Sequence, residues 1–272
     1  MGPTSPTHEF EHFLSRLNIA FRSECMSMSF DQLTAAMDGV RDLLANISIH
    51  RNNRVYINNV PDEMLIPIFQ EVLVQHELKK GLIRTIDAAD RKTAIRPLLD
   101  ITHVCSWWRK VAIGYPFLWT HIDIYNEKLV ELLANRSQSA ALSVFCDAKK
   151  LSAGEDYSPS LSRLAARLLR LDLSVDEAML KDVPRRYLSF QAPTMRCLTI
   201  IVPSKQHFHM VRDRSRGMNI LDDDVCSLSA LALAPVPKWF PSNSFPFLTH
   251  LYLGYNKPAH SARLLSLLSH AP

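Results

Sequence analysis

The chain has 272 residues, of which 47% are hydrophobic and 21% are charged, so it has room for one large domain or two modest ones with a sizeable core. Its formal net charge is only +4 and it contains no long run of Lys and Arg, which argues against nucleic acid as a partner. No apolar run is long enough to span a bilayer, and the first residues lack the basic and apolar regions of a signal peptide.

The cysteines indicate the redox compartment of the chain. They are odd in number, widely scattered and without a Cys-x-x-Cys pair: Cys25, Cys105, Cys146, Cys197 and Cys226. This usage fits reduced thiols better than a disulfide framework. We therefore expect a soluble protein of the cytoplasm, the nucleus or both, with no membrane partner.

Residues 1–52 are expected to be a helical segment that leads into a polar linker. The prediction depends on two apolar stripes at helical spacing: Phe10, Phe13, Leu14, Leu17 and Phe21, then Leu33, Met37, Val40, Leu44 and Ile47. Ser29 or Asp31 is suited to cap the second helix. Its stripe fits either a helix packed on the next domain or a short coiled coil for self-association, and the sequence leaves both open.

Residues 53–118 predict a domain with two apolar-faced helices. Pro61 suits the first position of a helix, and Pro67 lies deep enough in the same helix to delay its start or bend it. The second helix is expected to start at Pro97 and to end just before Gly114. Its predicted apolar face consists of Leu98, Ile101, Val104, Cys105, Trp108, Val111 and Ala112.

Three motifs occur in this region in a fixed order. They are Val60-Pro61-Asp62-Glu63-Met64-Leu65 with Ile68-Phe69, then Val104-Cys105-Ser106-Trp107-Trp108-Arg109, then Pro116-Phe117-Leu118-Trp119. Together they resemble the F-box-like domain of fungal substrate receptors in SCF-type ubiquitin ligases. The polar interval 75–96 makes the domain longer than the most compact form of that pattern.

The resemblance implies a chain without catalytic chemistry of its own. Apolar side chains of the two helices would bind a Skp-type adaptor subunit of a cullin complex, and the region that follows would hold an unknown substrate protein. By motif match the adaptor-binding residues are Val60, Pro61, Met64, Leu65, Ile68, Phe69, Leu98, Leu99, Val104 and Trp108. Trp108 has an alternative role, as an anchor between this domain and the first repeat.

Residues 119–272 carry a recurring unit of the form hydrophobic-x-x-hydrophobic-x-hydrophobic. Its central residues are 122, 142, 171, 198, 231 and 251, at steps of 20, 29, 27, 33 and 20. These steps centre on the leucine-rich-repeat period of roughly 20–29 residues. Helical pieces are expected between the strands, at 129–134, 160–169 and 262–269.

The expected fold is therefore α/β, with an N-terminal helical F-box-like module followed by a leucine-rich-repeat-like solenoid of short parallel strands and helices. The alternative is a compact α/β domain whose buried strands merely look alike. The end of the chain shows no polar capping unit, so we expect the solenoid to be incomplete at its C-terminus.

The sequence contains no catalytic motif: no phosphate loop, no His-Glu-x-x-His and no Gly-x-Ser-x-Gly. His207 and His209 have no Cys or carboxylate nearby, so neither a metal nor a cofactor is expected. The longest insertion, 203–224, carries Arg212, Arg214 and Arg216. These arginines either contact a phosphorylated or acidic substrate or belong to a solvated loop.

The sequence thus favours a non-enzymatic adaptor that recruits substrates for ubiquitin-dependent degradation and acts by proximity alone. The second hypothesis is a ligase-independent interaction scaffold in which the F-box-like domain has become structural packing. Pro67 and the interval 75–96 favour this alternative. An enzyme is the third hypothesis, and it has no catalytic constellation to support it.

Overall fold

The computed structural model describes residues 6–78, 95–124, 127–147, 158–202, 217–234 and 239–254. The chain divides into two compact units, Met1–Val60 and Pro61–Pro272. The first unit is helical, and the second combines helices with a parallel sheet, which is the α/β composition expected from the sequence.

The helices of the first unit are α1 (Pro6–Glu24), α2 (Phe30–Asn52) and the short 3-10 turn η1 (Tyr56–Asn59). Both predicted helices are confirmed, and the linker begins later than predicted because α2 continues to Asn52. Ser29 starts α2 with a capping box. Its side-chain oxygen accepts the Gln32 N–H at 3.3 Å, and its own N–H donates to Gln32 Oε1 at 2.8 Å.

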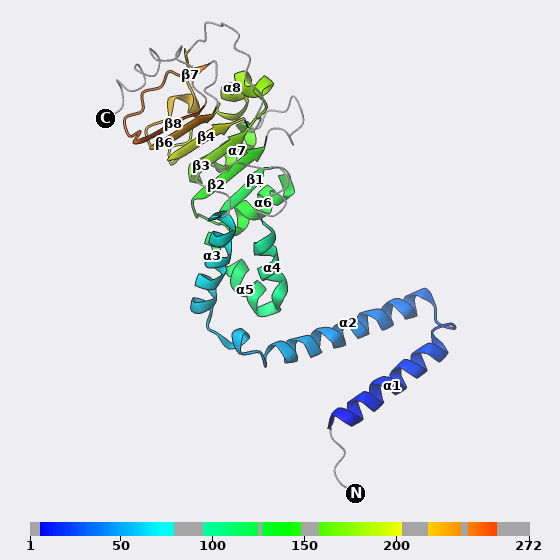
Figure 1. Cartoon of the computed structure of the whole chain (residues 1–272). Coiled ribbons are helices and arrows are strands. Elements are labelled where there is room, and N and C mark those ends of the chain that lie inside the picture. Colours follow the sequence, from blue (N-terminus) through cyan, green and yellow to red (C-terminus); the bar gives the residue numbers. More distant parts are fainter. Residues whose placement is uncertain are drawn as a thin grey trace. The chain divides into compact units, whose positions relative to one another are not determined.

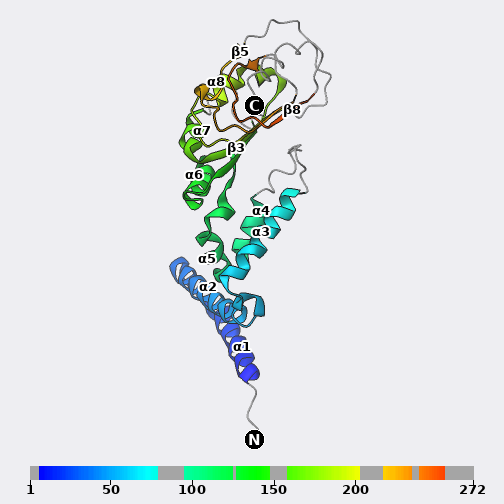
Figure 2. The ribbon, with the colours of Figure 1, turned by 90° about the vertical axis from the view of Figure 1, so that its left-hand side faces the viewer.

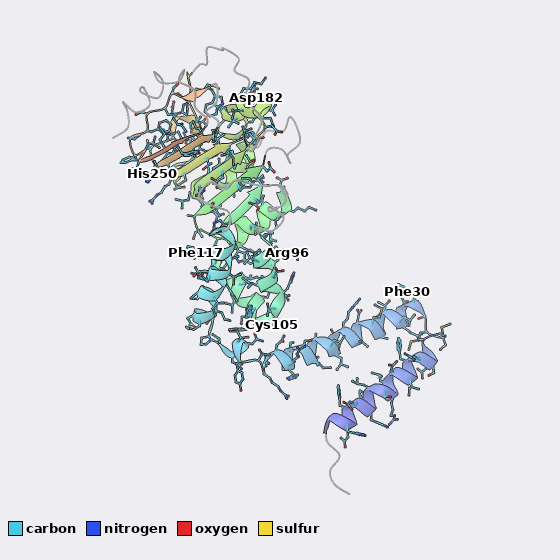
Figure 3. All side chains as sticks on the ribbon, in the orientation of Figure 1. Phe30, Arg96, Cys105, Phe117, Asp182 and His250 are labelled. Atoms are coloured by element: carbon cyan, nitrogen blue, oxygen red, sulfur yellow. The ribbon has the colours of Figure 1, made fainter. Side chains whose placement is uncertain are left out.

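The second unit opens with helices α3 (Asp62–Leu78), α4 (Arg96–Val104) and α5 (Ser106–Gly114), followed by the 3-10 turn η3 (Pro116–Trp119). The predicted single helix between Pro97 and Gly114 is wrong. Cys105 interrupts it with an extended backbone, at φ −159° and ψ 173°, between α4 and α5 (Figure 3). Its thiol then caps α5, since Sγ accepts the Trp108 N–H at 3.4 Å.

Helix α3 starts at Asp62 and continues through Pro67. The start is therefore not delayed. Proline has no N–H, so Pro67 removes one hydrogen bond from the helix interior at the carbonyl of Glu63. Leu65 and Phe69, on either side of Pro67, are completely buried.

Six strands form one parallel sheet in the order β1-β2-β3-β4-β6-β8 (Figure 1). The bounds are β1 (His121–Ile124), β2 (Leu142–Asp147), β3 (Leu168–Ser174), β4 (Cys197–Ile201), β6 (Ala230–Ala234) and β8 (His250–Leu253). A separate two-stranded parallel sheet pairs β5 (Gly217–Met218) with β7 (Phe240–Pro241). Each strand expected from the repeat pattern is present.

The register of the large sheet aligns the central residues of the repeats. One continuous row across the sheet contains Ile122, Val144, Leu171, Leu198, Leu231 and Leu251. The central residue predicted for the second strand, Leu142, is wrong by two residues, because Val144 is the residue that lies in this row. A second row, two residues further along each strand, contains Ile124, Cys146, Leu173, Ile200, Leu233 and Leu253. From β1 to β6 both rows are buried.

Helices cover the face of the sheet on which these rows lie. Figure 2 shows α6 (Glu127–Arg136), α7 (Ser158–Leu164) and α8 (Val183–Tyr187) stacked along one side of the strands. The 3-10 turns η5 (Ala165–Arg167), η6 (Glu177–Asp182) and η7 (Leu221–Asp223) complete this layer. The helix predicted at 160–169 ends early, since β3 already begins at Leu168, and the one predicted at 262–269 lies outside the described residues.

Candidate docking surfaces

The helices α3, α4 and α5 are held together by part of the predicted adaptor-binding set. Leu65, Phe69 and Leu98 are buried, and Trp108 is half-buried. The rings of Phe69 and Trp108 lie 5.0 Å apart at a tilt of 53°, so they join α3 to α5 by an aromatic contact. In this structure these four side chains form the internal packing of the helices.

The rest of the predicted set is accessible. Val60 is half-buried, and Pro61, Met64, Ile68, Leu99 and Val104 are exposed. Met64 and Ile68 are four residues apart and therefore lie on one face of α3. The same row continues to Val72, which is 44% exposed. Val72 is not among the predicted adaptor-binding residues. Its spacing of four from Ile68 is the sequence signal that would have added it.

Leu99 and Val104 do not share a face of α4. They are five residues apart, and at 3.6 residues per turn this places them well over a quarter-turn from each other. The buried side of the helix consists of Leu98, Ile101 and Thr102. The accessible apolar surface with a continuous row of side chains is therefore the one on α3, which we call the α3 row (Met64, Ile68 and Val72).

Trp119 connects the helices to the sheet. It is 1% exposed, and its indole N–H donates to the carbonyl of Ala112 in α5 at 2.8 Å. On the other side, the guanidinium carbon of Arg136 in α6 lies 4.3 Å from the centre of its ring. Trp119 thus contacts both α5 and α6, and so links the helices α3–α5 to the first strand–helix unit. The ring contact of Trp108 is instead with Phe69 of α3.

The face of the sheet opposite the helices is a second candidate surface. It presents the residues that alternate along the strands with those of the two buried rows. We call them the open sheet face: His121, Asp123, Ser143, Phe145, Arg170, Asp172, Cys197, Thr199, Ala230, Ala232, His250 and Tyr252. Its charged residues gather on β1 and β3, while β4 and β6 contribute small uncharged side chains. Tyr252 and His250 on β8 are exposed at the far side.

One charge on the open sheet face is buried and paired. Asp172 is 2% exposed, and Arg170 Nε donates to both of its carboxylate oxygens, at 3.1 and 2.8 Å. The arginine side chain itself remains about one-third exposed. The pair therefore presents a guanidinium at the surface of β3 and keeps the carboxylate beneath it.

The predicted substrate-binding arginines, Arg212, Arg214 and Arg216, lie outside the described residues. The described end of that insertion contains β5 and η7, in which Leu221, Asp222 and Asp223 adopt positive φ angles. Asn243 holds this turn. Its side chain exchanges two 3.0 Å hydrogen bonds with the backbone of Ile220 and donates to Asp223 Oδ1 at 2.9 Å.

Metal-binding clusters and membrane-spanning helices are the remaining features that would define a class of site. Among the described residues, no group of three or more His, Cys, Asp or Glu side chains is arranged to hold a metal ion. Within the same residues, no helix has both the length and the apolar character needed to cross a bilayer. Within the second unit, the candidate docking surfaces are therefore the α3 row and the open sheet face.

Comparison of the chain with protein-family models, with curated proteins and with solved structures finds no match in any of the three.

Proposed function

We propose that this chain is a non-catalytic substrate adaptor. In this proposal α3, α4 and α5 bind a Skp-type subunit of a cullin-containing ubiquitin ligase, and the sheet binds the protein to be modified. The resemblance of residues 60–119 to the F-box-like pattern supplies the class of partner. The chain itself contributes two binding surfaces on one unit.

The observation that carries the proposal is the α3 row. A helix in the interior of a domain buries its apolar residues, whereas α3 buries Leu65 and Phe69 and leaves Met64, Ile68 and Val72 accessible. Burying such a side chain completely contributes about 1.5–3 kcal/mol, before the costs of association. The opposite side of α3 is packed against its neighbouring helices, so this row of three exposed side chains is suited to a partner with a complementary apolar surface.

The second support for the proposal is the constant register of the sheet. Rows of aligned, mostly aliphatic side chains recur at steps of 22, 27, 27, 33 and 20 residues, and β1, β2, β3 and β4 are each followed by helical structure. We infer that residues 119–254 form a leucine-rich-repeat-like solenoid. Its open sheet face is the substrate-binding surface in this proposal, since it is the side that the helices leave uncovered.

The proposed mechanism is proximity. The substrate binds the open sheet face and the ligase binds the α3 row, so one chain holds the substrate close to the ligase subunits that transfer ubiquitin. No residue of this chain needs to gain or lose a proton. The contact at Trp119 matters here, because it links the helices that carry one proposed surface to the sheet that carries the other within the second unit.

Binding to a purified Skp-type subunit tests the proposal. We expect the full chain to bind, and the double variant Met64→Glu with Ile68→Glu to bind about a hundredfold more weakly, because it places two charges in an apolar interface. Both positions are exposed, so the variant should unfold at the same denaturant concentration as the wild type. Isothermal titration calorimetry measures the affinity.

Leu132→Glu is the matched control. Leu132 is 43% exposed on α6, so the same chemical change is made on a helix of the solenoid, and binding of the Skp-type subunit should be unchanged. Absence of binding by the wild-type chain, or equal losses in the control and in the double variant, contradicts the ligase link.

The second candidate function is a ligase-independent interaction scaffold. The observation that favours it is the burial of Leu65, Phe69 and Leu98, since these three motif residues serve internal packing. In that case the wild-type chain does not bind a Skp-type subunit, while affinity purification still recovers a partner through the open sheet face. Loss of that partner in a Tyr252→Glu variant, with the α3-row variant unaffected, would identify the scaffold.

A further inference from the structure

Helix α2 carries an apolar row from its first residue to Ile47. With Phe30 as the first helical residue, the row is Phe30, Leu33, Met37, Val40, Leu44 and Ile47, which we call the α2 seam. The steps along it alternate between three and four residues without interruption. This alternation averages 3.5 residues and is the spacing of core positions in a coiled coil, so the seam follows one side of a supercoiled helix over nearly three heptads.

The seam is accessible. Every residue of α2 is exposed or half-buried, and in the middle of the helix Met37, Val40 and Leu44 are each about half exposed. The helix is nevertheless well defined at its N-terminus, because the Ser29 capping box satisfies two backbone positions. A stable helix end combined with an uncovered heptad row calls for another helix as the covering element.

The residues beside the seam favour a second copy of the same helix. On one side they are Ala36 and Leu43, and on the other Thr34, Arg41 and Ser48. Arg41 is the one charge among these five, and it is already paired with Asp38 at 2.8 Å on its own helix. The acidic residues Asp31, Asp38 and Asp42 point away from the seam. Two copies can therefore meet along it without like charges facing each other.

Helix α1 extends the same argument. Phe10, Leu14, Leu17 and Phe21 follow steps of four, three and four, and all four side chains are exposed. Three heptads alone make a short coiled coil, so a second pair of apolar helices in the same unit adds the contact area that a dimer needs.

We propose that α2 pairs along its seam with α2 of a second copy of this chain, so that the unit Met1–Val60 is a dimerisation module. A dimer is the commonest closed assembly of identical chains. It carries two open sheet faces, and a partner with two binding sites is then held with an affinity that exceeds that of either face. This inference does not depend on the ligase link, since the α3 row is not used.

Light scattering coupled to size-exclusion chromatography tests the pairing on the full chain. We expect the wild type to have twice the 30.9 kDa mass of one chain. Leu44→Glu places a charge at the centre of the seam in both copies, so the dissociation constant should rise by about a hundredfold or more and the mass should fall to that of one chain.

Ile49→Glu is the matched control on the same helix. Ile49 is 44% exposed, comparable to the 57% of Leu44, but it lies two residues beyond Ile47 and so on the opposite side of α2. This variant should remain a dimer. Leu44→Ala and Ile49→Ala repeat the comparison with a residue that favours the helix, so that a loss of pairing is separated from a loss of helix by circular dichroism.

A wild-type chain that has the mass of a single copy up to roughly millimolar concentration, where even weak pairing is populated, overturns the proposal. Dissociation of the Ile49→Glu dimer to the same extent as Leu44→Glu also overturns it, because the seam would then have no special role. Dimers in the wild type and both Ile49 variants, with single chains in both Leu44 variants, support it.

Discussion

Helices α2 and α3 carry similar apolar rows, but they differ in how far their apolar residues are buried. In α3, Leu65 and Phe69 are buried against α4 and α5, which lie next to it in the same unit. In α2 every residue remains exposed or half-buried. The contrast shows that an amphipathic pattern specifies that a face will be covered but leaves the covering element unspecified. In the second unit the chain supplies that element, and for the first we have proposed a second copy.

The largest effect expected within the second unit is at Trp119. Trp119→Ala removes a fully buried indole that joins α5 to α6, and it should lower the free energy of unfolding by about 3–5 kcal/mol. Urea denaturation followed by circular dichroism measures the loss.

The control is Phe117→Ala, two residues away in the same 3-10 turn and 61% exposed. Its neighbour is Tyr115, at 5.7 Å between ring centres, so the loss should be about 1 kcal/mol or less. Equal losses for the two variants would mean that Trp119 does not connect the helices to the sheet.

The buried ion pair on β3 gives the next effect. Arg170→Met leaves the enclosed carboxylate of Asp172 without its guanidinium, and the free energy of unfolding should fall by about 1–3 kcal/mol. The matched variant is Arg163→Met, which removes the pair with Glu127 at 2.9 Å, exposed on both sides. Such surface pairs contribute about 0–1 kcal/mol. If Arg163→Met were the more destabilising of the two, burial of the Arg170–Asp172 pair would not explain its contribution to the free energy of unfolding.

The smallest effect belongs to the first unit. Ser29→Ala removes the capping box and should weaken the N-terminal turn of α2 by about 1 kcal/mol, while the unfolding midpoint of the sheet is unchanged. Hydrogen exchange at the α2 amides measures it. Ser48→Ala, an exposed change inside the same helix, should have the opposite sign and a size of about 0.5 kcal/mol. A shift of the sheet midpoint in Ser29→Ala would show that the two units unfold together.

The positions of the strands could be predicted from sequence because each one must place an aliphatic residue against the helices at a fixed point. That requirement leaves the same short pattern at residues 122, 171, 198, 231 and 251. The second strand was assigned the wrong centre because Leu142 is also buried. The pairing with β3 shifts between Leu142 and Ser143: Leu142 pairs with Leu168 and Ser143 with Arg170, so β3 has one extra residue, Leu169, at this point.

The candidate site was less predictable. A motif match selects residue types, and it gave the same weight to Leu65, which is enclosed, and to Met64, which is exposed. The break at Cys105 also left no signal, since neither Gly nor Pro marks it and the apolar spacing continues across it. Both failures have one cause: periodicity describes a single element, whereas exposure and helix breaks depend on what packs against it.

The unequal steps between strands have a consequence for how such a chain can change over time. Leu198 and Leu231 are 33 residues apart and Leu231 and Leu251 only 20, yet all three lie in one row of the sheet. Length differences are therefore absorbed outside the strands and leave the register untouched. Insertions and deletions between strands can therefore alter the segments at the rim of the sheet while its hydrophobic rows stay aligned and the core stays intact.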